Sequence, residues 1–282
     1  MANINWYPGH MTKSIRMIEE NIKLIDCLVY VLDARAPLSC INPDFERYIQ
    51  RLPVVYVLNK TDLADPAQTE KWKRKLTGER SVAVATNASA SKSCAVIVSE
   101  IRRLCAEKIS RYAAKGVKTS VKAMVLGVPN TGKSTIINNL IGKAKAITGN
   151  KAGVTRGKQW FKVNDTVEVL DTPGTLYPKL SDQNIARRLA YLGSIKDEVV
   201  DGYELAIELI RDLDEIKPEA ITARYGFTPV CDGEKDLTSV AKSRGFLLRG
   251  GEADLERAAV ALIDDFRKGR LGRITLDEVK ND

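Results

Sequence analysis

The chain has 282 residues, of which 44% are hydrophobic and 28% are charged. This balance is typical of globular proteins and excludes disordered and collagen-like chains. No apolar run approaches the ~18 residues that a membrane span requires. At roughly 100–200 residues per domain, the length fits one large domain or two of moderate size.

The cysteines and the one histidine argue against a disulfide framework and against a structural zinc site. The five cysteines are odd in number, and no two have C-x-x-C spacing. The first ten residues also lack the charged start and apolar stretch of a secretory signal. We therefore expect free thiols and a cytoplasmic location.

The net charge of +8 is spread unevenly along the chain. Residues 1–180 carry a net charge of +13, whereas residues 181–282 carry −5. A basic front half favours a polyanionic partner such as RNA. A solvated basic surface explains the charge equally well, so charge alone leaves both interpretations open.

Strand and helix patterns alternate up to about residue 180. Apolar residues recur every three or four positions from Met11 to Ile25, which predicts a helix. Further helices are expected at 43–51, 66–76, 93–111 and 133–140, and strands at 26–33, 53–58, 81–85, 123–126, 159–163 and 166–170. Because the main strands are continuously apolar, we predict a mostly parallel sheet covered by helices on both faces.

The pattern changes at about residue 181, where the charge also changes sign. Only helices are predicted beyond it, at 184–192, 202–213 and 255–267. We therefore expect an α/β domain over residues 1–180 and an all-α domain over residues 181–282.

Residues 127–134, GVPNTGKS, match G-x-x-x-x-G-K-[ST] at every fixed position, between an expected strand and an expected helix. The glycines let backbone N–H groups close around phosphate oxygens, and the helix N-terminus adds partial positive charge. A glycine turn before a helix is the alternative. The predicted phosphate-binding residues are Asn130, Thr131, Gly132, Lys133, Ser134 and Thr135.

Asp171-Thr172-Pro173-Gly174 follows the expected strand at 166–170. Asp171 and Ser134 can hold Mg²⁺, and the N–H of Gly174 can meet a γ-phosphate. Thr155 is predicted as a further metal ligand from its position in the loop between the motifs. Thr148 and Thr172 lie near it in the sequence, and an ordinary loop threonine is the alternative.

Asn59-Lys60-Thr61-Asp62 follows the strand at 53–58 and is similar to the N-K-x-D element of GTPases. The Asp62 carboxylate can accept hydrogen bonds from N1–H and N2–H₂ of guanine, a donor pair that adenine lacks. Asn59 is expected to tie this loop to the phosphate loop, and Lys60 to lie along the base. Thr86 and Asn87 are expected where the backbone caps the guanine oxygen.

The order of these motifs indicates a circular permutation. Ordinary GTPases run from phosphate loop to DxxG to N-K-x-D, whereas here N-K-x-D comes first. Such rewiring changes only surface connections and keeps the neighbours in the sheet.

Together with Trp6–Met11 (WYPGHM) and Asp33-Ala34-Arg35, this order resembles that of the YlqF/RbgA family of circularly permuted GTPases, over nearly the whole chain. The resemblance implies a P-loop GTPase fold with an RNA-facing helical domain, and a role in assembly of the large ribosomal subunit. Two departures are local. Cys40-Ile41 stands where relatives have Ser-Arg, and Thr175 follows DxxG where an aliphatic residue is usual.

A glutamine after DxxG orients the attacking water in many GTPases, and Thr175 is too short to do so. Because of the permutation, the helix expected from Met11 corresponds to the switch helix that follows DxxG. Its N-terminal end should therefore lie near the γ-phosphate, and His10 is placed there. A neutral imidazole can position water or accept its proton, a role that the resemblance also implies. A capping or RNA-contacting histidine is the alternative.

A second hypothesis concerns Asn130. In some GTPases an asparagine at this position helps to hold K⁺ beside the β- and γ-phosphates. A turn residue suited to its backbone angles is the alternative.

The predicted function is GTP hydrolysis stimulated by the large ribosomal subunit, through its rRNA and ribosomal proteins, with GTP/GDP and Mg²⁺ and, if Asn130 holds it, K⁺. A GTP-dependent RNA-binding state marker with negligible turnover is the alternative, and a P-loop kinase lacks support. We expect a monomer without membrane contact. The predicted RNA-binding residues are Lys242, Arg244, Arg267, Lys268, Arg270 and Arg273, with a solvated tail as the alternative.

Overall fold

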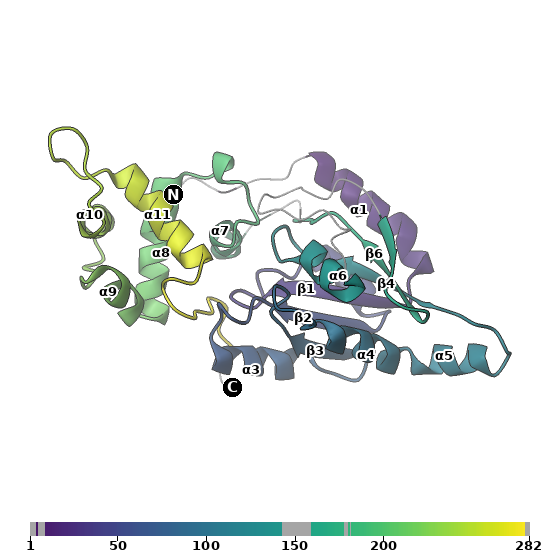
Figure 1. Ribbon diagram of the computed structural model, residues 1–282. Helices are drawn as coiled ribbons and strands as arrows, with labels where there is room; N and C mark the ends of the chain where they lie inside the picture. Colours follow the sequence, from purple (N-terminus) through teal and green to yellow (C-terminus); the bar gives the residue numbers. More distant parts are fainter. Residues whose placement is uncertain (1–3, 5–8, 143–158, 178–179, 181, 280–282) are drawn as a thin grey trace.

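The computed structural model describes residues 4, 9–142, 159–177, 180 and 182–279. A six-stranded sheet with its covering helices forms one end of the molecule, and a group of helices forms the other (Figure 1). The α/β region therefore precedes the helical region in the chain, as the sequence predicts.

The sheet has the strand order β3-β2-β1-β4-β6-β5. Its strands are β1 Cys27–Asp33, β2 Val54–Asn59, β3 Ser81–Ala85, β4 Val121–Leu126, β5 Gln159–Lys162 and β6 Val167–Asp171. Every neighbouring pair is parallel except β5 and β6, which form an antiparallel hairpin at the edge. The prediction of a mostly parallel sheet is confirmed.

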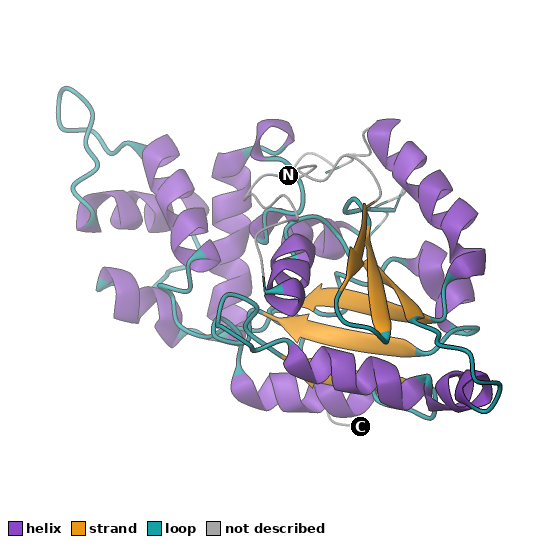
Figure 2. Ribbon diagram, turned by 45° about the vertical axis from the view of Figure 1, so that its right-hand side comes forward, coloured by secondary structure: helices purple, strands orange, loops and turns teal. Residues whose placement is uncertain are grey.

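Helices cover both faces of this sheet (Figure 2). Alternate side chains of β1 enter two separate cores: Leu28, Tyr30 and Leu32 enter the first, and Cys27, Val29 and Val31 the second. The first core includes side chains of α1 Gly9–Asn21 and α3 Pro66–Leu76, and the second those of α4 Ala95–Leu104 and α6 Lys133–Ile141. All of β1 is therefore buried, which explains its continuously apolar sequence.

Two predicted helices have a different form. The segment 43–51 is a 3₁₀ turn, Pro43–Phe45, followed by α2 Glu46–Ile49. The helix expected over 93–111 is divided into α4 and α5 Ala106–Ala113, because Cys105 leaves the helical conformation with φ −105° and ψ 17°.

The helical region contains α7 Gln183–Tyr191, α8 Gly202–Ile216, α9 Glu219–Tyr225, α10 Gly233–Ser243 and α11 Leu255–Arg267. Between residues 182 and 279 the structure has no strand. The sequence did not predict α9, which has 7 residues, or α10, which has 11. No helix in the described part of the chain is both long enough and apolar enough to cross a bilayer.

After α11 the chain returns to the α/β region. The N–H groups of Ile274 and Leu276 donate to the carbonyl oxygens of Leu63 (3.0 Å) and Arg35 (2.6 Å). The indole of Trp72 in α3 donates to the carbonyl oxygen of Asp277 at 2.6 Å. The helices of this region also share the first core with the sheet, so the two regions are packed together.

Candidate functional site

The loops after β1, β2, β4 and β6 meet at the carboxyl edge of the parallel sheet, where ligands bind in folds of this kind. The loop after β4 makes close backbone contacts that only glycine permits. A Cβ on Gly127 would lie 2.4 Å from the carbonyl oxygen of Val31, and one on Gly132 would lie 2.3 Å from Nδ2 of Asn59. Both glycines also have positive φ, 149° and 96°.

Lys133 opens α6 and is almost fully buried, at 7% exposure. Its Nζ donates to the carbonyl oxygen of Val128 at 2.8 Å. Burial lowers the pKa of Lys133 to about 8, and the Asp171 carboxylate acts in the opposite direction. A phosphate in the loop would supply the negative charge that this buried ammonium needs.

Asp171, the last residue of β6, faces the start of α6. Its Oδ2 lies 3.4 Å from Oγ of Ser134, and its buried Oδ1 has no hydrogen-bond partner among the residues that the structure describes. Burial raises the pKa of this carboxyl. A hydroxyl and an orphaned carboxylate oxygen are hard oxygen ligands of the kind that Mg²⁺ takes.

The segment after β6 packs directly on the phosphate loop. A Cβ on Gly174 would lie 2.7 Å from N and Cα of Pro129 and 2.9 Å from Nζ of Lys133. The N–H of Thr175 donates to the carbonyl oxygen of Gly127 at 3.3 Å. The hydroxyl of Thr172 donates a hydrogen bond to the carbonyl oxygen of Val125 at 2.6 Å. Thr148 and Thr155 lie outside the described residues.

Asn59 joins three loops at this edge. Its Nδ2 donates to the carbonyl oxygen of Thr131 in the phosphate loop at 2.7 Å, and its Oδ1 accepts the N–H of Ala88 at 3.0 Å. The loop after β3 is also tied to the loop after β2, because the N–H of Thr61 donates to the carbonyl oxygen of Thr86 at 3.3 Å. Asp62 is exposed beside these contacts.

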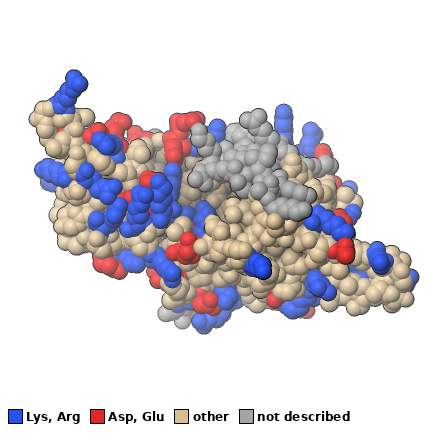
Figure 3. Space-filling view, in the orientation of Figure 1, with Lys and Arg blue, Asp and Glu red and all other residues tan. Residues whose placement is uncertain are grey.

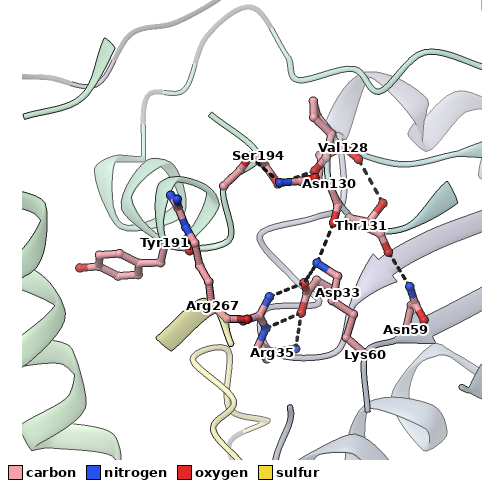
Figure 4. A network of polar contacts seen from close by, with 12 residues as sticks. Asp33, Arg35, Asn59, Lys60, Val128, Asn130, Thr131, Tyr191, Ser194 and Arg267 are labelled. Atoms are coloured by element: carbon pink, nitrogen blue, oxygen red, sulfur yellow. Dashed lines mark hydrogen bonds and ion pairs between the residues drawn. The ribbon is translucent and has the colours of Figure 1, made fainter. Parts of the chain in front are cut away.

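Lys60 connects the loop after β2 with the loop after β4. Its Nζ donates to the carbonyl oxygen of Asn130 at 2.7 Å and lies 2.9 Å from Oδ2 of Asp33 at the end of β1 (Figure 4). Burial favours the neutral form of Asp33, but Arg35 and Lys60 outweigh it and hold the pKa of the carboxyl well below its usual range. The residues expected to bind phosphate and base thus lie at one site.

Two residues of this site had no signal in the sequence. Nδ2 of Asn139 in α6 donates to the carbonyl oxygens of Ala88 (3.1 Å) and Ala90 (2.6 Å) and so fixes the loop after β3. Oγ of Ser194, after α7, donates to the carbonyl oxygen of Pro129 at 2.7 Å. Both contacts join residues far apart in the chain, which a local pattern does not reveal.

The structure describes His10 only as the second residue of α1, and its side chain lies outside the described part. Asn87 lies in the loop after β3, where its side-chain oxygen accepts the N–H of Ser89 at 3.0 Å. Thr135 follows Ser134 in the first turn of α6.

The six basic residues proposed for RNA divide into two groups. Arg267 bonds to Asp197 and to two backbone carbonyls at the end of α7, and Lys268 and Arg270 pair with acidic residues of α11. Lys242, Arg244 and Arg273 are exposed. Figure 3 shows Lys and Arg side chains gathered on one face of the helical region, with acidic ones among them.

Residues 122–224 match the profile of a protein family described as "50S ribosome-binding GTPase". The chain is 38% identical to "Ribosome biogenesis GTPase A" of Priestia megaterium over 278 residues, which cover 98% of this chain and 96% of the relative. This chain belongs to the ribosome biogenesis GTPase A family. It is a GTPase that binds GTP and GDP.

Two solved structures share the fold. The GDP-bound structure of TM YlqF has a TM-score of 0.68 and 26% identity, and the match covers 94% of this chain and 99% of that one. For GNP-bound YlqF from T. maritima the TM-score is 0.67 at 27% identity, with 94% and 98% coverage. The permuted GTPase fold with a helical C-terminal region is confirmed.

Proposed function

We propose that this GTPase acts on the large ribosomal subunit and hydrolyses GTP when that particle stimulates it. The observation that carries the proposal is the meeting of the phosphate loop, Asp171 and the Asn59–Asp62 loop at one edge of the sheet. The names of the relatives, "Ribosome biogenesis GTPase A", and the family description "50S ribosome-binding GTPase" support the choice of partner.

In this proposal the phosphates lie over the start of α6. Backbone N–H groups of residues 130–135 bind their oxygens, and the ammonium of Lys133 turns from the Val128 carbonyl to the β- and γ-phosphates. Ser134, Asp171 and Thr155 hold Mg²⁺, which when bound offsets negative charge on the phosphate oxygens. The N–H of Gly174 meets the γ-phosphate.

His10 is the proposed catalytic residue, because Thr175 is too short to orient water and α1 begins one residue before His10. Its neutral imidazole positions the attacking water or accepts its proton. Asn130 is proposed to help hold K⁺ beside the β- and γ-phosphates, where a fixed positive charge stabilises the charge that develops during transfer.

The base is proposed to lie on the stem of Lys60, with its N1–H and N2–H₂ donating to Asp62. Thr86 and Asn87 supply the backbone that caps the guanine oxygen. Asn59 and Asn139 hold the loop after β3 against the phosphate loop and α6, so the groups proposed to recognise guanine are in place before the nucleotide arrives.

We propose that rRNA contacts Lys242, Arg244 and Arg273, because these side chains are exposed, whereas the equally exposed Lys268 and Arg270 each pair with a carboxylate. Arg267, Lys268 and Arg270 are already engaged within the helical region, so we assign them a weaker share of RNA binding. We further propose that the chain is a monomer and acts in the cytoplasm, with ribosomal proteins as neighbours of the bound rRNA.

The test is GTP turnover in K⁺ buffer with and without purified ribosomal subunits. Unstimulated GTPases can turn over at about 10⁻⁴ s⁻¹, and activators can add up to ~10⁵-fold. The turnover rate of the protein alone therefore does not distinguish a stimulated GTPase from a state marker. Strong stimulation by large but not small subunits is expected. Tight GTP binding with no stimulation by large subunits, mature or immature, would instead favour a GTP-dependent RNA-binding state marker.

A further inference from the structure

The helical region is connected to the nucleotide-binding loops by a ring of polar contacts, most of which Figure 4 shows. Arg35 lies at its centre and is only 2% exposed. Nη1 of Arg35 donates to the carbonyl oxygens of Phe266 (3.3 Å) and Arg267 (3.2 Å), at the end of α11. The last carbonyl groups of a helix lack partners within it and carry partial negative charge, so a guanidinium is a suitable cap.

The same guanidinium binds Asp33 on its other side. Nε and Nη2 of Arg35 each lie 2.9 Å from a different oxygen of the Asp33 carboxylate, in a forked geometry that lysine does not reproduce. Oδ2 of Asp33 also holds Lys60, which donates to the carbonyl oxygen of Asn130. Three successive charged side chains thus link the end of α11 to the phosphate loop.

A second arm runs from the end of α7 to the same loop. Ser194, which is fully buried, donates to the carbonyl oxygen of Pro129, and Nδ2 of Asn130 donates to the carbonyl oxygen of Gly193 at 3.2 Å. Gly193 has φ 71°, and a Cβ there would lie 3.0 Å from Nδ2 of Asn130 and 3.5 Å from the Arg267 guanidinium. The segment is therefore fitted closely between the phosphate loop and α11.

Arg267 closes the ring. Its Nε and Nη2 donate to the carbonyl oxygens of Tyr191 (3.0 Å) and Ala190 (2.8 Å), so the ends of α7 and α11 are held together. Both arms start from this joined pair of helix ends; the first finishes on Asn130 and the second on Pro129 and Asn130. A displacement of the helix ends would act on the phosphate loop and on Lys60 at once.

We propose that Arg35 and Ser194 are positioning residues of the nucleotide site, which transmit the docking of α7 and α11 to Lys60 and to the phosphate loop and so set the rate of guanine-nucleotide release. The inference rests on the proposed place of Lys60 beside guanine. Neither residue has to touch the nucleotide. A partner that moves the helix ends away would therefore accelerate exchange.

The test is release of fluorescently labelled GDP from the full chain with Mg²⁺, followed after addition of excess unlabelled GDP. Arg35→Lys keeps a positive charge beside Asp33 but does not span both Asp33 and the α11 carbonyls. We expect about tenfold faster release, equivalent to about 1.4 kcal/mol. Ser194→Ala removes one hydrogen bond and is expected to accelerate release about threefold. Tight binding of the labelled GDP by the unmodified chain checks the proposed site separately.

A double-mutant cycle separates positioning from general loosening. If Arg35 acts through Lys60, Arg35→Lys adds no further acceleration in a Lys60→Met background. Asp277→Asn is the matched control. The Asp277 carboxylate joins Arg188 of α7 to Ser39 in the segment after β1, and in the described structure it makes no hydrogen bond to Lys60 or to the phosphate loop, so this variant should lose stability but release GDP at the original rate.

Three results would overturn the proposal: unchanged release in both single variants, full additivity of the Arg35 and Lys60 changes, or equal acceleration by Asp277→Asn. If Arg35→Lys does not fold, the release rate of Ser194→Ala alone tests the proposal: faster GDP release supports it, and unchanged release overturns it.

Discussion

The α/β region and the helical region use their charged residues in different ways. At the carboxyl edge of the sheet, Lys60 binds both Asp33 at the end of β1 and the carbonyl oxygen of Asn130 after β4, and so joins segments that are far apart in the sequence. In the helical region most ion pairs join neighbouring helices or successive turns, such as Arg224 with Asp265 and Lys268 with Asp264. Removing a charge should therefore disturb ligand geometry in the first region and helix packing in the second.

The largest effect is expected for Lys133→Ala, which removes the buried ammonium of the phosphate loop. Nucleotide affinity should fall at least about 100-fold, because two charge-assisted hydrogen bonds of about 1.5 kcal/mol each are lost. Equilibrium titration with a labelled, non-hydrolysable GTP analogue, which carries both the β- and the γ-phosphate, measures the change. Lys122→Ala, in β4, is the matched control and should bind normally. A loss below tenfold for Lys133→Ala would contradict the predicted site.

His10→Ala tests whether catalysis depends on the start of α1. We expect GTP binding to persist and subunit-stimulated turnover to fall about 100-fold, the lower range for loss of a general acid or base. Lys13→Ala, an exposed change on the same helix, should leave turnover intact. Undiminished stimulated turnover in His10→Ala would remove this residue from the mechanism.

Arg267→Ala tests the structural use of charge in the helical region. Its bonds to Asp197 and to the end of α7 would be lost, and we expect the free energy of unfolding to fall by about 2 kcal/mol. Urea unfolding followed by circular dichroism measures it. Lys268→Ala is the control, because its exposed pair with Asp264 is worth less than about 0.5 kcal/mol. Equal stability of the two variants would contradict the proposed role of Arg267 in helix packing.

Lys242→Ala and Arg244→Ala should have the smallest effect on folding, within about 0.5 kcal/mol, because both side chains are exposed. Each should weaken rRNA binding and make the negative slope of log affinity against log salt concentration shallower by about 1. Lys235→Ala, also on α10 but paired with Asp232, is the control. Unchanged salt dependence in both variants would show that RNA binds elsewhere.

The sequence predicted the parts of the fold that local chemistry determines. The buried strands read as apolar runs because both faces of the sheet are covered, and the phosphate loop needs glycine where Gly127 and Gly132 approach other backbone and side-chain atoms. The permutation followed from the order of these motifs. Each of these signals lies within a few consecutive residues.

The remaining features depend on contacts between distant segments. A basic run at 267–273 suggested RNA, yet Arg267 bonds to the end of α7, and only the packing of two helices reveals this. Asn139 and Ser194 carry no motif and act through carbonyl groups of remote loops. The sites of Thr155 and the His10 side chain stay predictions, since both lie outside the described residues.

The order of strands in the sheet has a consequence for folding. In the described sheet β1, β2 and β3 come from the earlier part of the sequence and β4, β5 and β6 from the later part, so the two sets of strands pair only where Cys27–Tyr30 lies beside Ala123–Leu126. This seam joins residues almost a hundred positions apart, and closing so long a loop is entropically costly. During synthesis β1, β2 and β3, with the Asn59–Asp62 loop, leave the ribosome first and cannot complete the sheet until β4 follows. Pairing at this seam is therefore the step that we expect to limit the folding rate.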